Sequence, residues 1–357
     1  MASTRQLRSS KRRTTTQSWP ISSKDQPSNT KGLPCLADEL YLEILSHFPP
    51  FPLPINHKTR DIQPYGDRRL VLDALSQTCR ALRRVSLRYR WQRIEVYSEM
   101  DLGKGPLPKV RHNSRGVSTC SKAYAEELVR QLEVVTVREP ALAEFVDVLD
   151  IYVTDYSAKT IVPELARCMS LMPNLHTIQI YLEWKGIFGF DYAQLIPCGF
   201  HRYVYPQIRT ACVSMNAFPI LSRAPNVKAL HVLKPNLRYT SGLLEYIKSI
   251  TPSINILGAI PVSAGAGEKP FSYYVDKILL FRDLQDVKFK LGIIPSDADM
   301  EALSKMPSLR VLRLLIHLNH AFNQRLVEDW ESRMKTTLFK ASDSSDESSK
   351  QLIVTIA

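Results

Sequence analysis

PNLHTIQI, at residues 173–180, is a short pattern that recurs along this chain of 357 residues and decides its fold. In each copy a Pro and a polar residue precede apolar residues that are spaced three and then two apart. Clear copies are PQIRTACV, PNVKALHV and PSLRVLRL, at residues 206–213, 225–232 and 307–314. Weaker copies begin at Val146, Ile254 and Leu284. Because alternation of apolar and polar residues is typical of a half-buried β-strand, each copy predicts one strand.

Amphipathic helices are predicted between these strands. Apolar residues recur at steps of three and four, as in Ile161, Leu165, Cys168 and Met172, and each run ends near the next Pro, which cannot continue a helix. One strand and one helix per unit, stacked in a row, give an irregular α/β solenoid with a parallel sheet inside and helices outside. The spacing of the copies brackets the roughly 20–29 residues of leucine-rich repeats. We therefore expect a leucine-rich-repeat-like body over residues 121–340.

The far end of this body carries two further predicted elements. A final amphipathic helix is predicted from apolar residues that are each four apart, namely Phe322, Leu326, Trp330 and Met334. An acidic, serine-rich linker follows at residues 341–350. Residues 351–357 (QLIVTIA) then form a short β-prone run that we expect to pair back onto the body as a C-terminal strand.

The concave face of the predicted sheet is the candidate surface for binding a target protein. Side chains that lie between the apolar anchors would point to this face, and exposed strand residues on a rigid curved scaffold are suited to reading a partner. For any one of them, a solvated position without a ligand is the alternative. The candidates are Gln179, Tyr181, His231, Lys288, Lys290 and Arg313, with the apolar Leu315 beside them.

A smaller helical module is predicted at residues 32–97. Apolar residues fall four apart from Leu36 to Phe48, which predicts one amphipathic helix, and a second pattern runs from Leu72 towards Tyr89. Between them, a Pro-rich insertion at residues 49–67 argues against regular structure. Residues 98–120 form a linker to the body.

Two passages of this module resemble the F-box, the helical motif by which substrate receptors dock onto the Skp adaptor of cullin–RING ubiquitin ligases. They are LADELYLEILSHF at residues 36–48 and LSQTCRALR at residues 75–83, with Trp91 beyond; Ala37 stands where the family usually has Pro. The resemblance implies an all-α module that binds the adaptor and, through it, the cullin scaffold. It implies adaptor contacts at Leu36, Glu39, Leu40, Ile44, Leu45, Phe48, Leu75, Cys79, Leu82 and Trp91. The alternative is a helical cap that packs its apolar faces on the chain's own body.

Basic residues are concentrated in two regions of a chain whose formal net charge is +12. Residues 1–31 contain seven Lys and Arg residues against one acid, with no apolar periodicity, and are predicted to be a disordered basic tail. Six arginines lie between Arg80 and Arg93, interleaved with Tyr89 and Trp91. Such a helix could bind nucleic acid, although it could equally be a solvated basic face or pair with an acidic partner surface.

No motif for catalysis is present in the sequence. It contains no nucleophile elbow, P-loop, GxGxxG or HExxH, and His317 with His320 has no nearby Cys or carboxylate until Glu328. We therefore expect no enzyme, no cofactor and no metal. The apolar runs are too short to span a bilayer. Six scattered cysteines without a CxxC pair, and an N-terminus without a secretory h-region, predict a protein of the cytosol or nucleus. The resulting hypothesis is a substrate receptor of a ubiquitin ligase that binds an unknown target protein, with a non-ligase repeat scaffold as the alternative.

Overall fold

The structure is a computed structural model. It describes residues 36–50, 63–97, 121–154, 156–183, 192–233, 240–262, 269–292, 294–316, 328–333 and 351–356, together with positions 32, 53, 100 and 107. Within these residues the chain is mixed α/β and builds a sheet of nine strands, all of them parallel, whose spatial order follows the chain. The predicted basic tail, almost all of the linker at 98–120 and the acidic linker fall outside the described residues.

The predicted repeats account for most of this sheet. The strands are β1 (Arg93–Val96), β2 (Val148–Thr154), β3 (Thr177–Glu183), β4 (Thr210–Ser214), β5 (Ala229–Leu233), β6 (Ile256–Val262), β7 (Asp286–Leu291), β8 (Val311–Ile316) and β9 (Gln351–Ile356). Each of the seven copies of the pattern yields one strand, from β2 to β8, so these predictions are confirmed. The C-terminal run is likewise confirmed as β9, which pairs with β8.

Helices connect the strands. The α-helices are α1 (Asp38–Ser46), α2 (Gln63–Thr78), α3 (Arg80–Arg90), α4 (Ser121–Glu133), α5 (Ala158–Ser170), α6 (Tyr192–Phe200), α7 (Thr240–Ile250), α8 (Phe271–Ile278) and α9 (Asp297–Ser304). A π-helical turn, η2 (Val134–Arg138), and a 3₁₀ turn, η3 (Pro140–Phe145), follow α4, and η4 (Met215–Arg223) is a 3₁₀ helix. The shortest strand-to-strand spacing, 19 residues from β4 to β5, is bridged by η4 alone.

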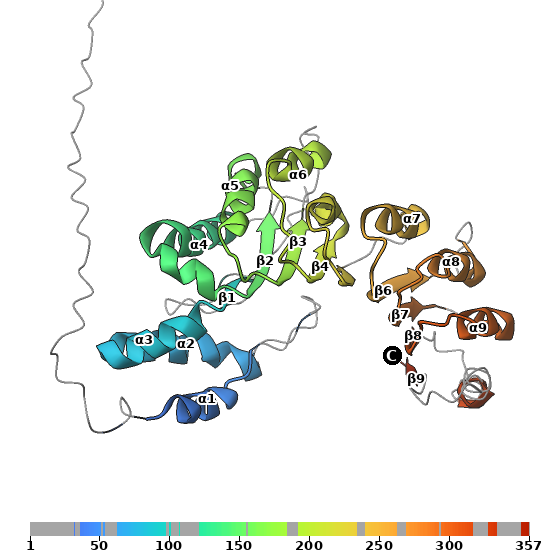
Figure 1. The fold of residues 1–357 in the computed structure, drawn as a ribbon, viewed down its shortest axis with the longest axis horizontal. Coiled ribbons are helices and arrows are strands. Elements are labelled where there is room, and N and C mark those ends of the chain that lie inside the picture. Colours follow the sequence, from blue (N-terminus) through green and yellow to red (C-terminus); the bar gives the residue numbers. More distant parts are fainter. Residues whose placement is uncertain are drawn as a thin grey trace, which may run out of the picture.

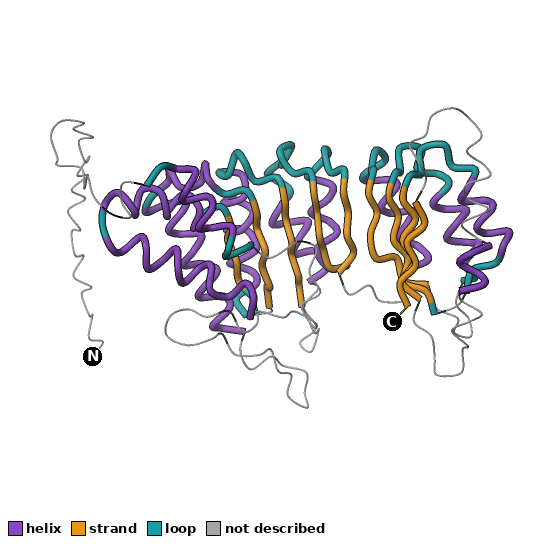
Figure 2. The backbone as a smooth tube through the Cα atoms, turned by 90° about the horizontal axis from the view of Figure 1, so that it is seen from below, coloured by secondary structure: helices purple, strands orange, loops and turns teal. Residues whose placement is uncertain are grey.

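Strands and helices form two layers that curve together. In Figure 1, α4 to α9 lie along the outer side of an arc whose inner side is the sheet. Figure 2 shows the strands side by side with helices behind them. The parallel order requires every connection to return to the same end of the sheet, which is why a helical segment follows each strand from β1 to β8.

The core lies between the sheet and the helices. One row across the sheet is in register from β2 to β8, and every side chain in it is at most 2% exposed: Leu149, Ile178, Ala211, Leu230, Leu257, Val287 and Leu312. Full burial of a Leu, Ile or Val side chain contributes about 1.5–3 kcal/mol. This row, repeated along each strand at every second position, holds the units together.

The N-termini of two helices have local explanations. At the start of α9, the Ser296 hydroxyl accepts a hydrogen bond from the Asp299 backbone N–H while the Asp299 carboxylate accepts one from the Ser296 N–H, which is a capping box. The predicted irregular segment is wrong at its end, since α2 begins at Gln63 and includes Pro64. Pro is tolerated in a first helical turn, where its missing N–H would have no partner.

The predicted final helix is described only at residues 328–333, which are helical. Trp330 is 3% exposed there, and its indole N–H donates to the Pro295 carbonyl at 3.0 Å. None of the helices in the described ranges is long and apolar enough to cross a lipid bilayer.

Candidate functional site

The helix α1 presents apolar side chains to solvent. Tyr41 and Leu45 are each 6% exposed and pack inward, whereas Leu40 is 50% and Leu42 is 52% exposed. Its C-terminal end is held by Arg68 of α2, whose Nη1 donates to the backbone carbonyl of Phe48 at 2.8 Å. The same Nη1 lies 3.3 Å from the Leu45 carbonyl. The attachment of α1 therefore leaves two large apolar residues without cover.

The predicted adaptor-binding residues fall into two groups. Half-buried or exposed positions are Leu36, Glu39, Leu40, Ile44, Phe48, Leu75 and Cys79. Leu45, Leu82 and Trp91 are at most 6% exposed, so in this structure their side chains are not available to a partner. Trp91 belongs to the main hydrophobic core and also lies beneath the Arg90 guanidinium, 4.6 Å from the ring centroid, whereas Leu45 and Leu82 are buried outside that core cluster. Sequence reasoning missed Leu42, whose signal was its apolar side chain outside the buried stripe of α1.

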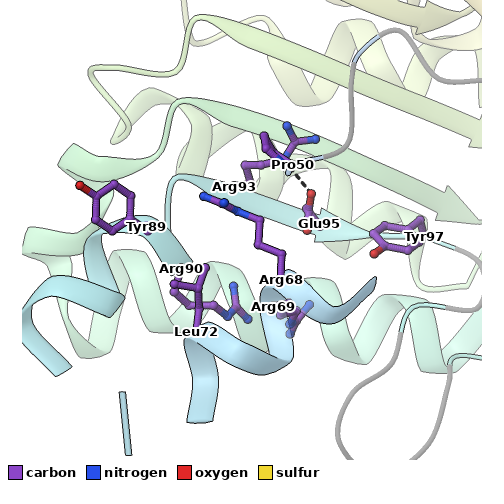
Figure 3. A pocket seen from close by; sticks show the side chains of 9 residues that line it. All are labelled: Pro50, Arg68, Arg69, Leu72, Tyr89, Arg90, Arg93, Glu95 and Tyr97. Carbon is purple, nitrogen blue, oxygen red and sulfur yellow. Dashed lines mark hydrogen bonds and ion pairs between the residues drawn. The ribbon is translucent and has the colours of Figure 1, made fainter. Parts of the chain in front are cut away.

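A small pocket lies where α2 and α3 meet β1 (Figure 3). Its volume is ≈ 20 Å³, room for roughly one water molecule. Arg93 Nε donates to Glu95 at 2.7 Å, whereas the buried Arg93 Nη2 has no hydrogen-bond partner. The pocket is lined by Pro50, Arg68, Arg69, Leu72, Tyr89, Arg90, Arg93, Glu95 and Tyr97.

A buried ion pair fastens α2 to α4. Arg69 Nη2 donates to Glu127 Oε1 at 2.8 Å, and the two side chains are 10% and 6% exposed. Arg130 and Gln131 also donate to Glu127. Burial by itself would raise the pKa of Glu127, but hydrogen bonds from Arg130 and Arg69 and their positive charges lower it to about 2. The carboxylate is therefore charged and fully engaged at neutral pH.

The arginine-rich helix α3 uses several of its charges within the chain. Arg90 Nε donates to Asp73 of α2 at 2.8 Å, and burial lowers the pKa of Arg90 to about 10. Arg83 Nη2 lies 3.3 Å from Glu139, in an exposed pair. Arg84 and Arg88 are exposed and keep the basic face of the helix. Much of the arginine cluster thus serves internal packing.

In the first half of the sheet, the face predicted to be concave and exposed is buried. Gln179 is 0% and Tyr181 is 7% exposed, so the expectation that they are available to a target is wrong for this structure. Gln179 Nε2 donates to Asp150 Oδ1 on β2 at 2.9 Å. The Tyr181 ring stacks on Tyr152 with centroids 4.7 Å apart. Cross-strand pairing therefore occupies both side chains.

In the second half, the predicted residues remain accessible. Lys288 and Lys290 are half-buried on β7, and Arg313 is exposed on β8, where its Nη2 donates to Asp286 at 2.9 Å. His231 is half-buried on β5, and burial lowers its pKa. Its ring occupies the space above Gly258, where an added Cβ would overlap the imidazole.

No group of three or more His, Cys, Asp or Glu residues that could hold a metal ion occurs in the part of the chain that the structure describes. His317 and His320 lie outside it. Neither a family model nor a curated protein matches the chain.

Proposed function

We propose that this protein is a substrate-receptor subunit of a Skp–cullin–F-box ubiquitin ligase. The observation that carries the proposal is the exposure of two large apolar residues of α1, Leu40 and Leu42, which are each about half exposed beside the buried Tyr41 and Leu45. Half-buried Ile44, Phe48 and Leu75 extend the apolar character of the module. Large apolar residues exposed on a short helix are typical of an interaction site. Together with the F-box-like sequence, they support docking of the Skp adaptor.

The sheet and its helices are proposed to be a degenerate leucine-rich-repeat-like solenoid that binds the target. Parallel strands in chain order, followed by helical connections on the outer layer, support this assignment. From β2 to β8 the strands begin between 19 residues (β4 to β5) and 33 residues (β3 to β4) apart. The irregular spacing is consistent with units that have lost the repeat consensus.

The proposed receptor performs no chemistry of its own. Its contribution is to raise the concentration of a bound target near the ubiquitin-charged enzyme that the ligase recruits. In this proposal the protein works in the cytosol or nucleus, without a cofactor.

A pull-down of the purified full chain with the Skp adaptor tests the proposal. Wild type should bind, and the double variant Leu40→Asp with Leu75→Asp should not, because charges would replace apolar contacts. The matched control is Leu171→Asp with Leu280→Asp, which alters exposed leucines elsewhere, 45% and 52% exposed, and should bind like wild type. Failure of wild type to bind, or equal binding by Leu40→Asp with Leu75→Asp, would refute adaptor docking.

A second candidate is a protein-binding scaffold without a ligase, in which α2 and α3 cap the sheet. The buried pair Arg69–Glu127 and the pairing of β1 with β2 favour it, because both tie the helical module to the body. Removing residues 1–50, which include α1, separates the two functions. The receptor then loses adaptor binding while the body stays folded, whereas the scaffold has no adaptor binding to lose.

A further inference from the structure

The inner face of β7 and β8 carries a basic strip formed by Lys288, Lys290 and Arg313. Lys288 and Lys290 alternate along β7 and therefore share one face of the sheet. Arg313 of β8 is in register with Lys288. Neighbouring strands lie about 4.8 Å apart, and alternate residues along a strand lie about 6.6 Å apart. The backbone positions that carry the three cationic side chains are therefore close together.

The positive charge of this strip is only partly neutralised. Arg313 pairs with Asp286 at 2.9 Å. Neither Lys288 nor Lys290 forms an ion pair or hydrogen bond with any residue in the described ranges, although both are half-buried. Burial lowers the pKa of Lys290, and the neighbouring charge of Lys288 lowers it further. Two adjacent ammonium groups are thus held partly out of water, and the carboxylate on the same face of β7, Asp286, is already paired with Arg313. An anionic ligand would stabilise this arrangement.

Apolar side chains border the strip. Leu315 is in register with Lys290 and is half-buried, and Ile353 of β9 is in register with Arg313 and is 37% exposed. On the other side, Ile256 of β6 is in register with Asp286 and is 36% exposed. From β6 to β9 the surface is about 14 Å wide, enough for an extended segment of about four residues at 3.3 Å each.

We propose that the basic strip and its apolar border dock an acidic, partly apolar peptide segment of a partner protein. Carboxylates of such a segment would pair with Lys288 and Lys290, and its apolar side chains would cover Leu315 and Ile353. The occupant is identified by charge complementarity, since a basic or neutral segment would leave the lysines unpaired. This inference rests on the proposed function in one respect: the partner that supplies the acidic segment is taken to be the target of the receptor.

The test measures, by anisotropy, the binding to the full chain of a fluorescent peptide whose glutamates and leucines are separated by single serines, so that both residue types project from the same face of an extended segment. Binding should weaken as salt rises and should fall at least about tenfold in Lys288→Glu with Lys290→Glu. The counterpart peptide with glutamine in place of glutamate should also bind at least about tenfold more weakly. Lys288→Met with Lys290→Met keeps most of the apolar stem, so loss of binding there with unchanged thermal unfolding separates lost charge from lost structure.

The matched control is Lys159→Glu with Lys305→Glu, which makes the same change of charge on two exposed lysines outside the strip. This variant should bind the peptide as wild type does. Equal weakening by the control, or equal binding of the glutamine peptide, would overturn the proposal. Tighter binding after neutralisation of Asp343, Asp346 and Glu347 would also overturn it, in favour of the chain's own acidic segment as the occupant. The peptide-binding assay contains no adaptor, so a negative pull-down would not change its outcome. A negative peptide-binding assay would likewise not change the outcome of the pull-down.

Discussion

The two halves of the sheet use polar residues differently although their strands arise from the same pattern. On β2 every residue after the first is buried, whereas on β7 buried and half-buried residues alternate. In the first half, Asp150 and Gln179 are fully buried and bonded to each other. In the second, Asp286 and Arg313 form a partly exposed pair beside Lys288 and Lys290, which form no ion pair with any residue that the structure describes. The first half is therefore built for internal cohesion, and the second keeps a charged surface.

The largest expected loss of stability comes from breaking the buried ion pair that joins α2 to α4 beside the first half of the sheet. Arg69→Met should destabilise the protein by about 3–5 kcal/mol, because it leaves the buried Glu127 carboxylate without one of its main partners. Arg83→Met breaks an exposed pair whose side chains are 53% and 47% exposed, and should cost about 0–1 kcal/mol. Chemical denaturation of both variants measures the difference. Similar losses in the two would remove the distinction between buried and surface pairs.

A smaller loss of stability is expected from substitutions in the sheet itself. Gln179→Ala should cost about 1–3 kcal/mol, since it leaves the buried Asp150 carboxylate with one hydrogen bond fewer. Arg313→Ala, at an exposed position of the second half, should cost about 0–1 kcal/mol. Thermal unfolding of the two variants compares the halves directly. A costlier Arg313→Ala would show that the second half depends on its surface charges for stability.

A further expected effect is a pH dependence that belongs to the first half. The pKa of Glu127 is about 2 in the folded protein and near 4.5 when unfolded, so its contribution is present above pH 4.5 and is lost as the pH falls towards 2. The free energy of unfolding should therefore decline less steeply below pH 4.5 in Glu127→Gln than in wild type. Parallel declines would mean that other carboxylates account for the acid sensitivity.

The sequence predicts which segments form strands, but it does not predict which faces of those strands are exposed to solvent. The apolar anchors that flank Gln179 or Lys288 have the same spacing, so both copies predict a strand with one buried face. Whether the other face is also buried depends on what packs over it and on cross-strand partners such as Asp150, which no local pattern contains. The same limit applies to the helical module. The sequence predicts Leu45 and Leu82 as docking residues, whereas tertiary packing buries both side chains.

Arg68 holds α1 through hydrogen bonds to the backbone of the α1 C-terminal end. Its guanidinium bonds to the backbone carbonyls of Leu45 and Phe48, groups that every amino acid possesses. Attachment at that end of the helix is therefore insensitive to which side chains α1 carries on its outer face. Substitutions at Leu40 and Leu42 can retune partner choice while the helix keeps its anchor, which makes α1 a convenient position for redesigning specificity.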